Sequence, residues 1–211
     1  MILSTSIYKF FRFCSIYGLR RTIIKTLGRL NFNFPIYIFI KNYFLFKNKI
    51  NVGFIGTGHH SFSSIAFFLC RNTNSKFIWA YDINLKNLKK FKISYGIKDK
   101  LNDYKNITPD IVYIVSNHST HTEYAIDFLN KGVDVYVEKP ISTNYEQLKS
   151  LDMVLKNTNN KLFAGYNRPF SKAIKYFKNK MVFYNQEPLT ASFFVIGHKI
   201  PENHWYRKKN E

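Results

Sequence analysis

The chain has 211 residues, 45% of them hydrophobic, which excludes a disordered polypeptide and allows one complete domain with part of a second. Its formal net charge of +19 would favour nucleic acid or an anionic membrane as a partner. The excess is mostly lysine and comes with abundant Asn, Ile, Phe and Tyr, which A/T-rich codons specify, so genome bias suffices to explain it and we expect no specific nucleic-acid function.

The first predicted region, residues 1–49, is a basic and apolar extension. No Asp or Glu occurs before Asp82. The most apolar stretch, 32–46, is interrupted and is shorter than the ~20 residues that span a bilayer, and Lys9 and Arg12 break the apolar run that a secretory signal needs. Three interpretations remain open: a transit peptide, an interfacial membrane anchor, and a segment that packs on the rest of the protein.

From Ile50 onward, short apolar runs alternate with segments of helical period, which predicts repeated βαβ units. The first strand is 50–56, and the helix after it has an apolar stripe of Phe62, Ile65, Ala66 and Leu69. The second strand, 76–82, ends at Asp82 and precedes a helix whose predicted stripe is Leu85, Leu88 and Phe91.

The second half of this region continues the pattern. Residues 111–115 are apolar throughout, as in a central strand covered on both faces, and the next helix ends near Gly132, where glycine tolerates a left-handed conformation. A further strand ends at Pro140. Thr143 and Glu146 predict a capping box for a helix that carries Leu148, Leu151 and Leu155, and residues 161–167 supply another strand.

After Asn167 the sequence predicts a short helix at 170–177 and one strand, 189–198. A lone strand cannot satisfy its backbone groups, so we expect a fragment or a strand that pairs with another chain. We therefore divide the chain into the extension 1–49, a Rossmann-type doubly wound parallel α/β domain at 50–167, and the truncated beginning of a substrate and dimerisation domain at 168–211. The isolated cysteines indicate neither a disulfide scaffold nor structural zinc and fit a reducing cytosol.

The sequence GTGHHS lies between the first strand and its helix. Gly56 allows a tight turn, Gly58 lets a pyrophosphate approach the backbone, and the small Ser61 takes the third position of the glycine motif. The helix that follows offers N–H groups and a positive dipole end to phosphates. We assign the turn, including His59 and His60, to cofactor binding.

Asp82 ends the second strand, where an acid accepts hydrogen bonds from the adenosine ribose hydroxyls and repels a 2′-phosphate. NAD is therefore the predicted cofactor, and nearby Lys86 and Lys89 keep NADP as the alternative. The simpler interpretation of Asp82 is a helix N-terminal acid that holds no ligand.

Taken in order, GTGHHS, YDIN, SNHSTHTEYAI, VYVEKPIS and AGYNRPFS resemble the Gfo/Idh/MocA family of sugar oxidoreductases, over about residues 50–205. The resemblance implies a Rossmann domain followed by an α/β domain with an open sheet, and NAD(P)-dependent hydride transfer at a sugar or nucleotide-sugar. It matches Lys139 to the family's lysine for proton relay and substrate positioning. A lysine at the carboxyl end of a strand can take or give the proton that accompanies hydride transfer.

We expect different roles for Glu138 and Pro140, the two neighbours of Lys139. Glu138 points to the opposite face of its strand, so we expect a hydrogen-bonding residue rather than a second base, placed in the cofactor site. Pro140 ends the strand, and the resemblance implies a cis bond before it.

The resemblance also matches Ser116, Asn117, His118 and His121 to the loop near the nicotinamide and its ribose. The simpler interpretation of His121 is a helix N-terminal side chain that bonds backbone groups. Four histidines on two loops raise a metal hypothesis, but the dinucleotide needs the same space and no acid or cysteine accompanies them, so we assign no metal.

Asn167 matches the floor of the active site and is assigned to the cofactor. Arg168 is assigned to the substrate, with a domain tether as its alternative, and His204 and Trp205 are placed facing the sugar. The family continues into a histidine that works with the lysine, which this chain does not reach, so a catalytically incomplete nucleotide-binding fragment is the alternative function.

We further expect a cytoplasmic enzyme of carbohydrate or surface polysaccharide metabolism, with peripheral membrane contact through the extension as an option. A homo-oligomer is expected where the second domain is complete.

Overall fold

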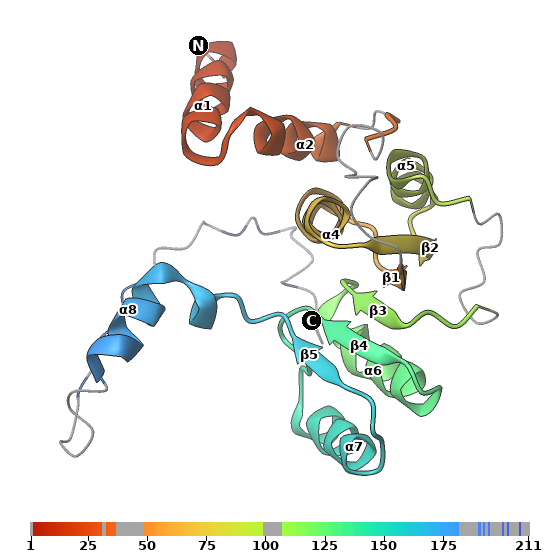
Figure 1. Ribbon diagram of the computed structural model, residues 1–211. Coiled ribbons are helices and arrows are strands. Elements are labelled where there is room, and N and C mark those ends of the chain that lie inside the picture. Colours follow the sequence, from red (N-terminus) through yellow and green to blue (C-terminus); the bar gives the residue numbers. More distant parts are fainter. Residues whose placement is uncertain are drawn as a thin grey trace.

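The structure is a computed structural model that describes residues 2–30, 33–36, 49–98 and 107–181, together with the single positions 190, 192, 194, 200, 202 and 207. Most of the predicted strand 189–198 lies outside the described residues, as do His204 and Trp205. Figure 1 shows the order of the elements along the chain.

The centre of the molecule is a five-stranded sheet with the order β2-β1-β3-β4-β5, in which every neighbouring pair is parallel. The chain therefore builds outward from β1 to β2 on one side and then crosses to β3 on the other. The point between β1 and β3 is the topological switch point of a doubly wound sheet, and the predicted Rossmann-type α/β class is confirmed. The strands are β1 Ile50–Ile55, β2 Ser75–Tyr81, β3 Ile111–Ile114, β4 Asp134–Val137 and β5 Leu162–Ala164.

Helices cover both faces of the sheet. One face packs on a π-helical segment and on α4 and α5, around Phe54, Phe62 and Phe91, and the other packs on α6 and α7, around Val112 and Phe128. β3 lies in the middle of the sheet and buries Val112 and Ile114 completely, as its apolar sequence predicts. The helices are the π-helical Ser61–Ala66, α4 Phe67–Asn72, α5 Leu85–Tyr95, α6 His121–Asn130 and α7 Tyr145–Lys156.

The helix after the glycine turn differs from the prediction. Its first part, Ser61–Ala66, is π-helical and holds one residue more per hydrogen-bonded ring than an α-helix. This extra residue rotates the later part of the helix, so Phe67 and Cys70 are buried, whereas Ile65 and Leu69 are only half-buried. Of the predicted stripe, Phe62 and Ala66 are fully buried, and Ile65 and Leu69 pack against the same core while staying partly exposed.

Two other helix predictions need correction. The helix N-cap of α7 is Asn144, whose side chain accepts a hydrogen bond from the backbone N–H of Gln147, so the predicted capping box is displaced by one residue. Leu148 is 44% exposed and Leu151 is buried, while Leu155 is partly buried. In α5, Leu85 is 66% exposed, because Asn84 caps the helix and leaves Leu85 in its first, outward-facing turn.

The end of α6 is as predicted. Gly132 has a φ of +75°, and the N–H groups of Gly132 and Val133 donate to the carbonyls of Leu129 and Phe128. This is the Schellman arrangement, which a glycine accommodates without strain.

The basic extension forms α1 (Ile2–Tyr17) and α2 (Leu19–Arg29). α2 lies against the π-helical segment and buries Ile24 in the same core cluster as Phe54. The ammonium group of Lys90 in α5 donates to the carbonyl of Gly28 at 2.9 Å, and burial lowers the pKa of Lys90. Of the three interpretations, packing on the rest of the protein is confirmed for α2.

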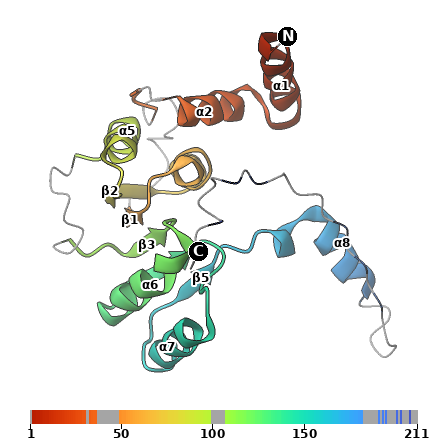
Figure 2. The same ribbon diagram turned by 180° about the vertical axis from the view of Figure 1, so that it is seen from behind.

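The remaining elements lie at the outside. α1 stands clear of the sheet beyond α2, and α8 (Lys172–Met181) extends away on the other side after a short helical turn, Arg168–Phe170 (Figures 1 and 2). The prediction of a short helix near 170–177 is therefore confirmed. Among the helices in the described ranges, none is long and apolar enough to cross a membrane.

Candidate functional site

Gly56 lies where the loop after β1 contacts the loop after β3. Its φ is +86°, and its N–H donates to the carbonyl of Tyr81 at 2.9 Å. A Cβ at this position would lie 2.5 Å from the carbonyl oxygen of Val115, far inside contact distance. Only glycine fits both the conformation and the space, so the turn is held directly against the loop that carries Ser116.

Gly58 has a different role in the same turn. A Cβ built on Gly58 would meet no atom within 4 Å, so this part of the backbone faces open space. The chain becomes helical at His59, whose turn presents backbone N–H groups at a positive dipole end. Ser61 is fully buried at the third motif position, and its hydroxyl has no hydrogen-bond partner among the described residues.

Asp82 holds the glycine turn from inside. Its Oδ2 accepts hydrogen bonds from the N–H of Thr57 at 2.6 Å and from the hydroxyl of Thr57 at 2.8 Å, and its Oδ1 accepts from the N–H of Asn84 at 2.7 Å. Thr57 was not among the site residues predicted from the sequence. A hydroxyl residue in the middle of G-T-G, with an acid at the end of the next strand, was the available signal.

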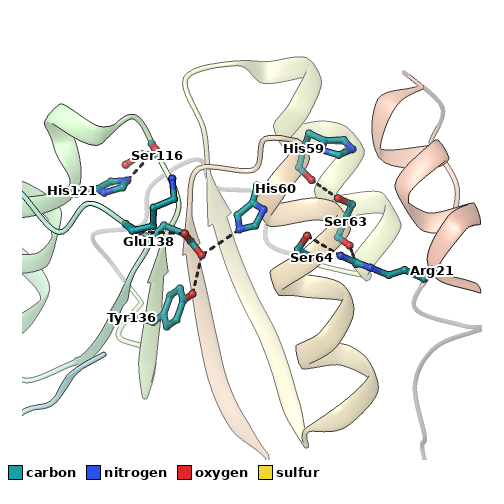
Figure 3. Close-up of polar contacts among 10 residues, drawn as sticks. Arg21, His59, His60, Ser63, Ser64, Ser116, His121, Tyr136 and Glu138 are labelled. Atoms are coloured by element: carbon teal, nitrogen blue, oxygen red, sulfur yellow. Dashed lines mark hydrogen bonds and ion pairs between the residues drawn. The ribbon is translucent and has the colours of Figure 1, made fainter. Parts of the chain in front are cut away.

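The two adjacent histidines of the turn diverge, as Figure 3 shows. His59 turns toward α2, with its Nε2 3.4 Å from the carbonyl oxygen of Lys25. Burial lowers the pKa of His59, and the positive charges of Arg29 and Lys25 lower it further. His60 turns the other way, and its Nε2 lies 3.2 Å from Oε1 of Glu138. Only His60 therefore faces the loop after β4.

Glu138 is the centre of a small polar network beside that loop (Figure 3). The hydroxyl of Tyr136 donates to its Oε1 at 2.8 Å, and the N–H of Lys139 donates to its Oε2 at 3.3 Å. Burial by itself would raise the pKa of Glu138, but the hydrogen bonds from His60 and Tyr136 outweigh it and lower the pKa. Burial and the neighbouring carboxylate raise the pKa of Tyr136. Glu138 is thus held as an anion that links two loops.

His121 connects the loops after β3 and β4. Its side chain is buried, with Nδ1 2.7 Å from the carbonyl oxygen of Pro140 and Nε2 3.1 Å from that of Ser116. The peptide bond between Lys139 and Pro140 is cis, as the family resemblance implied. Because the ring is enclosed between two backbone carbonyls, the geometry favours the simpler interpretation of His121, a residue that fixes the position of the Lys139 loop.

These loops enclose a cleft of about 870 Å³ at the carboxyl edge of the sheet. This volume is within the range of about 300–1,000 Å³ that small-molecule sites occupy. Its wall contains eight of the predicted site residues, namely His60, Ser116, His118, His121, Glu138, Lys139, Asn167 and Arg168. Among the described residues, Val115, Gly165, Tyr166 and Pro169 also line it.

Some predicted residues do not line this cleft. Gly56, Gly58 and Ser61 belong to the adjacent turn and the start of its helix, Asp82 follows β2 and holds that turn, and His59 faces α2 instead. Asn117 is exposed next to the cleft wall.

The rings of His59, His60 and His121 each contact a different group. The part of the chain that the structure describes holds no cluster of three His, Cys, Asp or Glu side chains arranged for a metal ion. A dinucleotide suits the turn better, because Gly58 leaves its backbone open and Asp82 stands at the end of β2.

The comparisons with known proteins agree with this geometry. A relative from Akkermansia muciniphila, named glycosyl hydrolase family 109 protein 2, is 28% identical over 116 residues, which is 49% of this chain and 24% of that protein. Oxidoreductase P35 of Formosa agariphila is 27% identical over 128 residues, which is 58% of this chain and 39% of the relative. The chain thus spans well under half the length of these curated relatives.

Two solved structures show the shared fold. A dehydrogenase (MviM) from Clostridium difficile superposes with a TM-score of 0.57 at 29% identity, over 63% of this chain and 44% of that one. A scyllo-inositol dehydrogenase from Lactobacillus casei, solved with bound NAD(H) and scyllo-inositol, gives a TM-score of 0.59 at 24% identity, over 66% and 42% of the two chains. The profile of the Gfo/Idh/MocA oxidoreductases, described as an NAD-binding Rossmann fold, matches residues 50–166, more than half of the sequence, and this chain belongs to that family.

Proposed function

We propose that this chain is the nucleotide-binding part of an NAD(P)-dependent oxidoreductase that transfers hydride at a carbon of a sugar or nucleotide-sugar. The observation that carries the proposal is the cleft at the switch point of the sheet, which brings Lys139 and Arg168 next to the glycine turn. Ligands of doubly wound sheets bind at this position. The name of the Akkermansia relative, a glycosyl hydrolase, supports carbohydrate as the substrate class.

The cofactor would be held mainly by backbone. The open face at Gly58 and the N–H groups at the start of the helix suit the diphosphate, and the loop Ser116–Asn117–His118 lies where the nicotinamide end would rest. When bound, the nicotinamide supplies or accepts the hydride. Oδ2 of Asp82 accepts two hydrogen bonds from Thr57, but Oδ1 accepts only one, from Asn84, and keeps a lone pair for a ribose hydroxyl of NAD. The negative charge of the carboxylate would repel the 2′-phosphate of NADP.

Lys139 would move the proton. It is exposed at the end of β4 and lines the cleft, so its amine can reach a sugar hydroxyl there and take or give the proton that accompanies hydride transfer. Glu138 and His121 would act as positioning residues, because each ties the backbone on one side of Lys139 to a neighbouring loop.

Arg168 would bind substrate oxygens or a phosphate, since its guanidinium lines the cleft and offers several donors in one plane. Asn167 would contact the cofactor from the floor of the same cleft. We keep His204 and Trp205 as substrate residues within this proposal. A homo-oligomeric, cytoplasmic enzyme of surface polysaccharide or other carbohydrate metabolism completes it.

A second candidate function is nucleotide binding without turnover. It is favoured by the glycine turn, where the open face at Gly58 and the carboxylate of Asp82 form the cofactor site without any contribution from Lys139. The two candidates share the cofactor site and differ only in the chemistry at Lys139.

The decisive experiment measures NAD binding and turnover separately on the full chain. Isothermal titration with NAD and NADP should show NAD binding more tightly, and a panel of sugars and nucleotide-sugars should give NADH absorbance with at least one member. Lys139→Ala should lower turnover by about 10²–10⁴-fold, the usual contribution of general acid–base catalysis, while the Kd for NAD stays within about threefold.

Lys161→Ala is the matched control, because Lys161 is an exposed lysine at the opposite, amino end of β5. Its turnover should equal that of the unchanged chain. Binding of NAD with no turnover on any substrate would select the second candidate, and absence of NAD binding would reject both.

A further inference from the structure

We propose that α1, together with the outer side of α2, docks this protein onto an anionic lipid bilayer, with Ile7, Tyr8 and Phe11 entering the membrane interface. This inference is independent of the proposed reaction, because none of these residues contributes to the cleft.

The first observation is a group of large apolar side chains left in solvent on α1. Ile7 is 52% exposed, and Tyr8 and Phe11 are each 66% exposed. Ile7 and Phe11 are four residues apart and Tyr8 and Phe11 three apart, so on a helix all three project from one side. Exposed single apolar residues are ordinary, but a cluster of them marks an interaction site.

The second observation is that the inner side of α1 is already occupied. The rings of Phe13 and Tyr17 lie 4.3 Å apart between their centroids, and the ammonium of Lys25 in α2 lies 4.3 Å from the Phe13 centroid. α2 in turn buries Ile24 against the sheet domain. Both views of the molecule place α1 beyond α2 and away from the sheet (Figures 1 and 2). Ile7, Tyr8 and Phe11 are exposed on this outlying helix.

The third observation is the charge around this apolar side. Lys9 and Arg12 are exposed beside it on α1, and Arg20 and Arg29 are exposed on α2. No Asp or Glu occurs in the sequence before Asp82. Apolar side chains flanked by unopposed basic residues are typical of a helix that lies in the plane of an anionic bilayer surface.

The charge of the chain also favours an anionic bilayer over a second copy of the chain or nucleic acid as the partner. A second copy of the chain would bring another +19 charge against the first, so electrostatic repulsion opposes pairing through this basic face. Nucleic acid would satisfy the basic residues but would leave Ile7 and Phe11 in water. With 16 residues, α1 is too short to span the hydrocarbon core and is suited to lie flat on it.

The test uses the full chain in flotation assays with vesicles of phosphatidylglycerol and phosphatidylcholine, and with phosphatidylcholine alone. We expect binding to the anionic vesicles that weakens in neutral vesicles and at high salt. The double variant Tyr8→Ser/Phe11→Ser should partition at least about tenfold more weakly, because it removes two large apolar groups from the interface.

The matched control is Tyr145→Ser/Met153→Ser, which removes two apolar residues that are 73% and 52% exposed on α7, far from α1. It should bind within about twofold of the unchanged chain. Circular dichroism and NAD titration of both double variants check that the fold is kept. Equal binding by the two double variants, or no binding by the unchanged chain, would overturn the proposal.

Insertion is measured directly with Phe11→Trp, whose fluorescence should shift to the blue and be quenched by brominated lipid, whereas Tyr145→Trp should change in neither respect. An unquenched Phe11→Trp variant would contradict the proposal. So would a dimer that dissociates on Tyr8→Ser/Phe11→Ser, which would assign the face to a second copy, or DNA binding that is tighter than vesicle binding and indifferent to that change.

Discussion

The two halves of the site are built differently. On the β1–β2 side, the glycine turn is closed by Asp82 and Thr57, whose polar groups already bond each other, and what it offers a ligand is backbone. On the other side of the site, Lys139 after β4 and Arg168 after β5 line the cleft, and His121 holds the loop that carries Lys139. One half of the site therefore depends on backbone conformation and the other on side-chain chemistry. Substitutions in the first half should change stability and NAD binding, and substitutions in the second half should change turnover.

Gly56→Ala should have the largest effect, because it tests the conformational half. The added Cβ would lie 2.5 Å from the Val115 carbonyl oxygen at a φ of +86°, so we expect a loss of about 4 kcal/mol in unfolding free energy or failure to fold. Urea unfolding measures it. Gly58→Ala is the matched control, since its Cβ enters open space, and it should keep stability within about 1 kcal/mol while weakening NAD binding.

His121→Ala should be next, because it tests the support of the side-chain half. It leaves two carbonyl oxygens without the ring and opens a hole at a buried position, which should cost about 2–3 kcal/mol in unfolding free energy. Turnover should fall more than NAD affinity, because the Lys139 loop loses its anchor. His118→Ala, on the same loop but half-buried, should change stability by under about 1 kcal/mol; equal losses would contradict the positioning role.

Arg21→Ala tests whether the extension supports the glycine-turn helix. The guanidinium donates to the carbonyl of Ser63 and, at 3.1 Å, to the hydroxyl of Ser64, both within the π-helical segment (Figure 3). Since Arg21 is partly buried, we expect a loss of about 1 kcal/mol and a severalfold weaker affinity for NAD. Arg20→Ala removes the exposed neighbouring charge and should change neither the unfolding free energy nor the affinity for NAD.

The smallest expected effect is the pH dependence of stability that comes from the contact between Glu138 and His60, which links the two halves of the site. The folded pKa of Glu138 is lowered, so its charge adds stability above the unfolded value of 4.5, and this contribution disappears as pH falls through the folded pKa. The stability difference between the unchanged chain and Glu138→Gln should therefore be present at about pH 5 and shrink as the pH falls further. Urea titrations from about pH 5 downward measure it, and a difference that grows over this range would refute the assignment.

The sequence was sufficient for the features that depend on local pattern. The strands, the left-handed Gly132 and the glycine turn follow from apolar period and from residues with one conformational use. The errors arose where neighbours compete for one role: Asn144 caps α7 in place of Thr143, and Asn84 leaves Leu85 outside. Thr143 and Asn144 are both residue types that cap helices well, so the sequence alone does not decide which of them caps α7, and packing decides it.

The site was predictable in its parts but not in its connections. His60 and Glu138 are 78 residues apart, and no spacing indicates that their side chains meet. His59 and His60 look equivalent in sequence, yet the helical start sends one toward α2 and the other toward the cleft. The π-helical turn was not predicted, and one of its carbonyls, that of Ser63, accepts a hydrogen bond from Arg21, which is 42 residues away in the sequence.

The bond from Lys90 to the carbonyl of Gly28 joins groups 62 residues apart, and it has a consequence for biosynthesis. α2 leaves the ribosome long before α5 exists, and at about 5–20 residues per second it waits several seconds for that lysine. Throughout this delay the core around Ile24 lacks the side chains that α5 contributes, so the nascent N-terminus exposes apolar surface until α5 is made.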